Sequence, residues 1–175
     1  MATDTLASHS PLQRGESSAG PAVYEQGIAA GVLGAAAIAL WFFFIDLVQG
    51  RPLFTPSVLG TFLFHGGAAV AAPERVPISF QMVVVFTWIH FLVFIVIGIA
   101  ASLLLDVAER NRNLGFGIVM FFVFFEFGFA AFSTFFAESV LTALTLTKVL
   151  LGNLLAAAVM GVYFWRHHQR MVIEP

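Results

Sequence analysis

The sequence contains no cysteine, and charged residues make up only 10% of its 175 positions. Without thiols the chain forms no disulfides and offers no thiolate for catalysis, iron–sulfur clusters or zinc. Soluble domains carry about 25% charged residues, so a chain this poor in charge cannot cover a water-facing surface. A formal net charge of -2 without a basic run argues against nucleic-acid binding. Hydrophobic residues fill 59% of the sequence, which indicates that lipid is the solvent.

Four apolar stretches are long enough to cross a bilayer, which needs about 20 apolar residues at a rise of about 1.5 Å each. The predicted spans are 27–48, 78–105, 114–137 and 144–165. The sequence therefore predicts an all-α integral membrane protein, a bundle of four transmembrane helices. Three segments follow from these spans: a disordered cytoplasmic tail at 1–23, a four-span domain at 24–168 and a short C-terminal tail at 169–175. The first of these lacks the basic start and apolar core of a cleavable signal peptide.

Basic residues beside the spans predict the orientation, because Lys and Arg are retained on the cytoplasmic side. One side holds Arg14, Arg110, Arg112, Arg166 and Arg170, and the other holds Arg51 and Arg75 with Lys148 near it. Both termini are therefore expected in the cytoplasm, and the composition is typical of a bacterial inner membrane protein. Short connections at 106–113 and around Glu138 predict that spans two, three and four are antiparallel neighbours.

The connection between the first two spans is long, faces outward and is unusually apolar for a loop. Within it, Thr55 resembles a helix N-cap and Pro56 a first helical residue, opening a short helix that runs through Phe64. His65 and the glycines after it end this helix. A helix this short cannot span, so we expect it to lie in the membrane interface. Two roles are open, namely packing on the bundle or covering a site between the helices as a lid.

The rare polar residues within the spans fall into two layers when their depth is counted at about 1.5 Å per residue. His90, Glu126 and Asn153 lie near the middle of the bilayer, about 18 to 22 Å from the cytoplasmic ends. Asp46 and Lys148 lie near the outer boundary, where we expect an ion pair that fixes the first span against the fourth. The layering predicts that the helices bring these side chains together.

The middle layer has two interpretations. A neutral Glu126 bonded to Asn153 or His90 holds helices together, because polar contacts between helices in lipid supply about 1 kcal/mol each. Alternatively, His90 and Glu126 exchange a proton in a transport or ligand-binding site.

Metal and haem chemistry find little support in the sequence. A haem held by two histidines needs both within the spans, and only His90 is inside one; His65 lies in the outer connection, and His167 with His168 lies in a basic headgroup-facing belt. The Glu-x-x-His pairs of di-iron bundles and the common hydrolase motifs are missing. We therefore predict no cofactor, no metal and no catalytic residue.

Small residues mark faces where helices can approach closely. The first span carries Gly27, Gly31 and Gly34 with Ala30 and Ala35, and the fourth carries Gly152, Ala156, Ala157 and Gly161. These two faces either pack together or form a dimer contact. The third span is instead crowded on every side with Phe, so some of its rings must face lipid, another subunit or an isoprenoid ligand.

The leading hypothesis is a non-enzymatic accessory or assembly subunit that offers its Phe-rich third span to other membrane subunits or to a second copy. A small proton-coupled transporter using His90 and Glu126 is one alternative. A quinone- or haem-associated redox subunit is the other, although it needs more ligands at mid-membrane depth than this chain has.

Overall fold

The computed structural model describes residues 20–110 and 146–168, and within these ranges every regular element is a helix. The elements are α1 (Pro21–Val48), α2 (Phe54–His65), the 3-10 helices η1 (Gly67–Val70) and η2 (Pro73–Arg75), α3 (Phe80–Arg110) and α6 (Leu146–His168). The all-helical prediction is therefore confirmed for the described part of the chain. The expected span 114–137, the first two residues of the expected span 144–165 and both tails beyond 20–168 lie outside it.

Three of these helices, α1, α3 and α6, are long and apolar enough to cross a membrane. They match the first, second and fourth predicted spans, with shifted ends. The first helix begins at Pro21 rather than Gly27, because proline is preorganised for the first helical position and Gly20 before it is extended. The second begins at Phe80, after Ser79 caps it by accepting a hydrogen bond from the Met82 amide at 3.4 Å.

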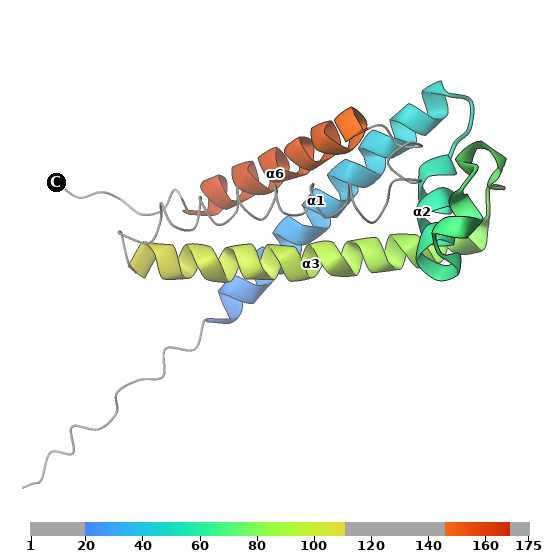
Figure 1. Ribbon diagram of the computed structural model, residues 1–175. Coiled ribbons are helices and arrows are strands. Elements are labelled where there is room, and N and C mark those ends of the chain that lie inside the picture. Colours follow the sequence, from blue (N-terminus) through green and yellow to red (C-terminus); the bar gives the residue numbers. More distant parts are fainter. Residues whose placement is uncertain (1–19, 111–145, 169–175) are drawn as a thin grey trace, which may run out of the picture.

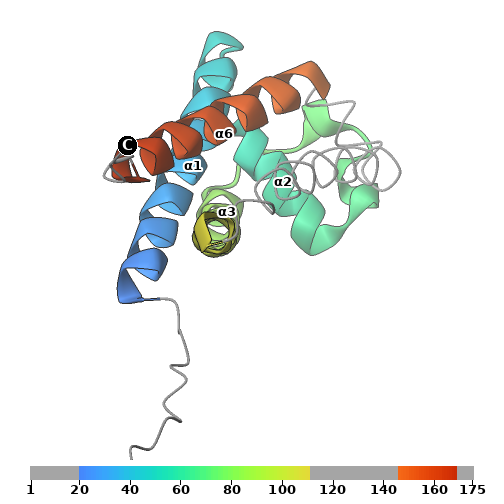
Figure 2. The same cartoon turned by 90° about the vertical axis from the view of Figure 1, so that its left-hand side faces the viewer.

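The spanning helices run in alternating directions around α1 (Figure 1). Both α3 and α6 run opposite to α1, and both contact it. As a result, the start of α1 and the ends of α3 and α6 share one end of the bundle (Figures 1 and 2). We call the opposite end, where α1 finishes and α3 and α6 begin, the α2 end.

A small apolar core is shared by the three helices in the half of the bundle away from the end of α1. Ala30 of α1 is fully buried against Met160 and Phe164 of α6, and α3 closes the cluster. The α3 side chains are Phe94, Ile97, Ala101 and Leu105. Many large apolar side chains point outward instead, as expected when the surrounding solvent is lipid.

Helix α2 lies across the spanning helices rather than along them (Figures 1 and 2). It begins one residue before Thr55, with Leu53 as its N-cap in a left-handed conformation at φ 66°. The prediction of Thr55 as the N-cap is therefore wrong. At the other end Gly66, at φ 78°, donates its amide to the Phe62 carbonyl and ends the helix as expected.

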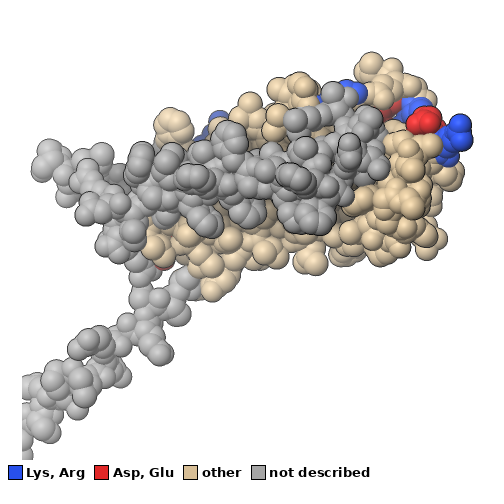
Figure 3. Space-filling view, viewed as in Figure 1, with Lys and Arg blue, Asp and Glu red and all other residues tan. Residues whose placement is uncertain are grey.

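Charged side chains are scarce along the bundle. In the space-filling view, the Lys, Arg, Asp and Glu side chains that are visible gather mainly at the α2 end, and few of them are visible on the described surface along the rest of the bundle (Figure 3). This distribution fits helices whose middle lies in hydrocarbon and whose end reaches the headgroups.

Candidate functional site

The most deeply buried carboxylate of the described residues belongs to Asp46, in the last turn of α1. Its side chain is only 1% exposed. One carboxylate oxygen accepts the Thr55 amide at 2.7 Å, and the other accepts the Thr55 hydroxyl, also at 2.7 Å. These bonds satisfy a free amide in the first turn of α2 and place a negative charge at its positive end. The amide of Thr55 is one that the N-cap side chain of α2 would usually accept, and here Asp46 of α1 accepts it instead. Thr55 thus donates to the capping group and is not itself the cap.

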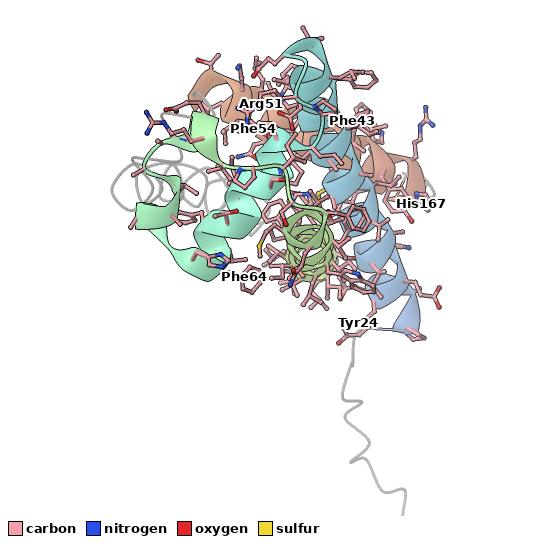
Figure 4. All side chains as sticks on the ribbon, turned by 90° about the vertical axis from the view of Figure 1, so that its right-hand side faces the viewer. Tyr24, Phe43, Arg51, Phe54, Phe64 and His167 are labelled. Carbon is pink, nitrogen blue, oxygen red and sulfur yellow. The ribbon has the colours of Figure 1, made fainter. Side chains whose placement is uncertain are left out.

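A compact cap surrounds this Asp46–Thr55 joint. Arg51 lies 3.9 Å above the Phe54 ring and donates to the Val76 carbonyl at 3.2 Å (Figure 4). Beneath them, Phe54, Val58, Val70 and Val76 form a buried cluster that also touches α1 and α6. We call the folded segment 49–79 the outer cap. Its burial shows that this long connection is an ordered structure tied to the bundle.

The outer cap is also fixed to the start of α3. The Ser79 amide donates to the buried Ser57 hydroxyl at 3.2 Å. Three residues further along α2, a Cβ on Gly60 would lie 2.7 Å from the Met82 carbonyl oxygen. Because only glycine permits this approach, α2 crosses the first turn of α3 in backbone contact.

Lys148 approaches α1 through its backbone. The Trp41 indole donates to the Lys148 carbonyl at 2.9 Å, and a Cβ on Gly152 would lie 2.9 Å from the same indole. Both hydrogen bonds of the Asp46 carboxylate go to Thr55. The predicted ion pair between Asp46 and Lys148 stays a prediction.

His90 lies between α1 and α3, half-way along α1. Its Nε2 is 3.2 Å from the Ala35 carbonyl oxygen, and because a carbonyl only accepts, Nε2 must carry the proton of this bond. The rings of Phe86 and Phe94 pack on the imidazole with centroids 5.8 Å and 4.8 Å away. The histidine is thus used to join two spanning helices.

Of the other two members of the predicted middle layer, Asn153 is the one that belongs to the described residues. Asn153 is half-buried on α6, and none of the hydrogen bonds recorded among the described residues joins it to His90. Glu126 lies outside the described residues. The grouping of these three side chains therefore stays a prediction.

The small residues of α1 serve two neighbours rather than one. A Cβ on Gly27 would lie 2.5 Å from the Ile99 Cα, and a Cβ on Gly31 would lie 2.7 Å from the Ile95 Cα, both on α3. Gly34 faces both neighbours, since a Cβ there would lie 2.7 Å from the Met160 sulfur of α6 and 3.1 Å from the Phe94 ring of α3. The glycine face of α1 therefore packs mainly on α3, while Gly34 also meets α6. Ala156 is buried on α6.

Two residues of this crossing were missed by the sequence analysis. Gly98 of α3 faces the backbone of Gly27 and Gly31, and the buried Ser102 donates to the Val23 carbonyl at 2.8 Å. Their spacing of four residues is itself a small-xxx-small pattern on the second span, so a signal for them was present.

These features describe an integral membrane protein of the helical class. Every buried side-chain nitrogen or oxygen of the described residues has a hydrogen-bond partner. Among the same residues, no three His, Asp or Glu side chains group as a metal site. Comparison with protein-family models, with curated proteins and with solved structures finds no match to this chain.

Proposed function

We propose that the chain is a non-enzymatic accessory or assembly subunit of a membrane protein complex. The observation that carries this proposal is the use of the buried and half-buried polar groups between the helices. Asp46, His90 and Ser102 each bond to another helix of the same chain. Within the described part, the polar chemistry of the interior is thus used for holding helices together, which supports a structural role.

The proposed architecture is a four-span bundle with α2 in the membrane interface. In an up-and-down four-helix bundle, the first helix contacts the second and the fourth, which are parallel to each other and lie diagonally across the bundle. The contacts of α1 with antiparallel α3 and α6 fit this arrangement. The apolar segment 114–137 is long enough to supply the remaining helix, and its Phe side chains are the proposed contact with other subunits or with a second copy.

The proposed orientation has both termini in the cytoplasm of a bacterium, with the bundle in its inner membrane. The start of α1 and the ends of α3 and α6 share one end of the bundle (Figure 1). Most of the basic residues flank that end in the sequence, and the positive-inside rule assigns such an end to the cytoplasm.

In-cell photocrosslinking tests the subunit proposal. A photoreactive phenylalanine analogue placed at Phe124 should give discrete protein adducts, whereas the same analogue at Leu40, a 56% exposed residue of α1, should react mainly with lipid. Purification in mild detergent followed by native mass spectrometry identifies the partner. Recovery of the 19.0 kDa chain alone, without protein adducts at Phe124, would contradict the proposal.

A proton-coupled transporter is the second candidate, favoured by the position of the His90 imidazole half-way along α1. Its test is proton-driven uptake into vesicles, which Glu126→Gln and His90→Ala should abolish in protein that still assembles. A redox subunit is the third candidate, and an absorption spectrum of the purified protein would show its haem or quinone.

A further inference from the structure

We infer that the C-terminal tip of α2, formed by Leu63 and Phe64, inserts among the lipid acyl chains at the α2 end, and that the Asp46–Thr55 joint holds it there. This inference rests on the membrane placement proposed above but not on the subunit role. It gives the outer cap a function of its own, as an anchor in one leaflet.

The depth of α2 follows from its contacts with α3. The 31 residues of α3 extend about 46 Å at 1.5 Å per residue, while the hydrocarbon core is about 30 Å thick. When α3 is centred in the bilayer, its first turn therefore lies within about 8 Å of the boundary between acyl chains and headgroups. Because Gly60 packs directly on the Met82 backbone in that turn, α2 lies at the same depth. Helices at this depth bury an apolar face about 5 to 10 Å into the boundary.

The direction of α2 carries its tip away from the bundle. Phe54, at its start, lies near the centre of the α2 end, whereas Phe64 lies at the periphery (Figure 4). Burial follows the same course, because Phe54 is 9% exposed, while Leu63 and Phe64 are 50% and 51% exposed. Two large apolar side chains thus leave the protein at a depth where acyl chains begin, and lipid is the partner whose chemistry fits them.

The first turn of this helix is held by Asp46, in addition to the contacts that Ser57 and Gly60 make with the start of α3. Leu53 is in a left-handed conformation that a leucine rarely adopts, and it provides no side-chain cap. The Asp46 carboxylate is the group that satisfies the start of the helix, through two bonds of 2.7 Å to Thr55. Asp46 is therefore a positioning residue for the tip.

Site-directed spin labelling tests the insertion, and the natural absence of cysteine makes each introduced thiol unique. Phe64→Cys, labelled with a nitroxide and reconstituted in phosphatidylcholine nanodiscs, should collide more with oxygen, which concentrates among acyl chains, than with a water-soluble nickel complex. Glu74→Cys on the exposed η2 should show the reverse order. A Phe64 label that favours nickel, or one shielded from both reagents by a protein partner, would overturn the inference.

The joint is tested in the labelled Phe64→Cys protein. Thr55→Val removes the hydroxyl bond but keeps the amide, and Asp46→Ala removes both bonds. We expect a stepwise loss of oxygen preference and a stepwise gain in label mobility. Thr87→Val is the matched control, since the Thr87 hydroxyl bonds only within α3, at 2.7 Å to the Val83 carbonyl.

Asp46→Asn keeps an acceptor for the amide but loses the charge, so it covers the case in which Asp46→Ala does not fold, and its effect should be smaller than that of Asp46→Ala. Labels that do not respond to Thr55→Val or Asp46→Asn would refute the positioning role. The depth of the Phe64 label and its response to the joint variants are both measured without a partner protein. A failure of this inference is therefore distinguishable from a failure of the subunit proposal.

Discussion

Adding one methyl group to Gly31 should destabilise the bundle, whereas the same change at Gly161 should not. In Gly31→Ala the new Cβ would lie 2.7 Å from the Ile95 Cα and 2.8 Å from the Phe94 carbonyl carbon, well inside van der Waals contact. Both atoms are backbone, so no side chain can rotate away and α1 must separate from α3. At Gly161 the new Cβ meets no atom within 4 Å.

Comparing Gly31→Ala with Gly161→Ala isolates the free-energy cost of the steric overlap between α1 and α3. Both positions are in helices, so the helix-propensity gain of about 1 kcal/mol from Gly to Ala is shared and cancels. Overpacking of a close contact costs about 1 to 3 kcal/mol, and this is the expected difference in free energy of unfolding between the two variants.

The assay is reversible unfolding by sodium dodecyl sulfate in mixed micelles, followed by circular dichroism, with Gly161→Ala as the reference. If Gly31→Ala unfolds at the same detergent fraction as Gly161→Ala, the α1–α3 crossing is not in backbone contact and the reasoning fails.

Three further substitutions test individual links between helices by the same assay. Trp41→Phe removes the indole bond to the Lys148 carbonyl and should cost about 0.6 kcal/mol, the average for such bonds in lipid; no loss would mean that α6 is held without it. Ser102→Ala removes the bond to the Val23 carbonyl and should cost a similar amount, about 0.6 kcal/mol, without loss of helix signal. His90→Phe keeps an aromatic ring of similar size but loses the hydrogen bond to α1, so a cost of about 1 kcal/mol or less is expected. Full loss of assembly would mean that His90 does more than form this hydrogen bond.

Hydropathy was sufficient to predict α1, α3 and α6 because each spanning helix needs an apolar stretch of known minimum length. Their exact ends depend on local capping. Pro21 extends the first helix beyond its apolar stretch, and Ser79 delays the start of the second by two residues, from the expected 78 to Phe80. The end of the short outer helix was predictable because Gly66 adopts a positive φ that glycine readily supplies.

Which helices are neighbours could not be read from the small residues alone. Gly27, Gly31 and Gly34 form one face in the sequence, but the structure places all three against α3 and only Gly34 against α6 as well. A glycine face reports only that some helix approaches closely, since its partner contributes backbone rather than a recognisable side chain.

The hydrogen-bond partner of the Asp46 carboxylate could not be predicted from the sequence either. A carboxylate near the headgroups predicts a basic partner such as Lys148, but the connection after α1 turns back through Gly50 and Leu53, both at positive φ, and brings Thr55 to it. Gly50 is an ordinary residue for such a turn. Leu53 is not, so its conformation follows from the surrounding contacts rather than from its own preference.

The position of α1 has a consequence for assembly. Lipid offers no hydrophobic drive for helix association, so helices in a bilayer are held by close packing and hydrogen bonds. On α1 these contacts are divided by partner: the Gly31 region meets α3, Trp41 meets α6, and Asp46 meets α2. Since α1 is synthesised first and α6 last, its α3 and α2 contacts can form before its α6 face is covered. Among the described helices, we therefore expect the contact between α1 and α6 to form last.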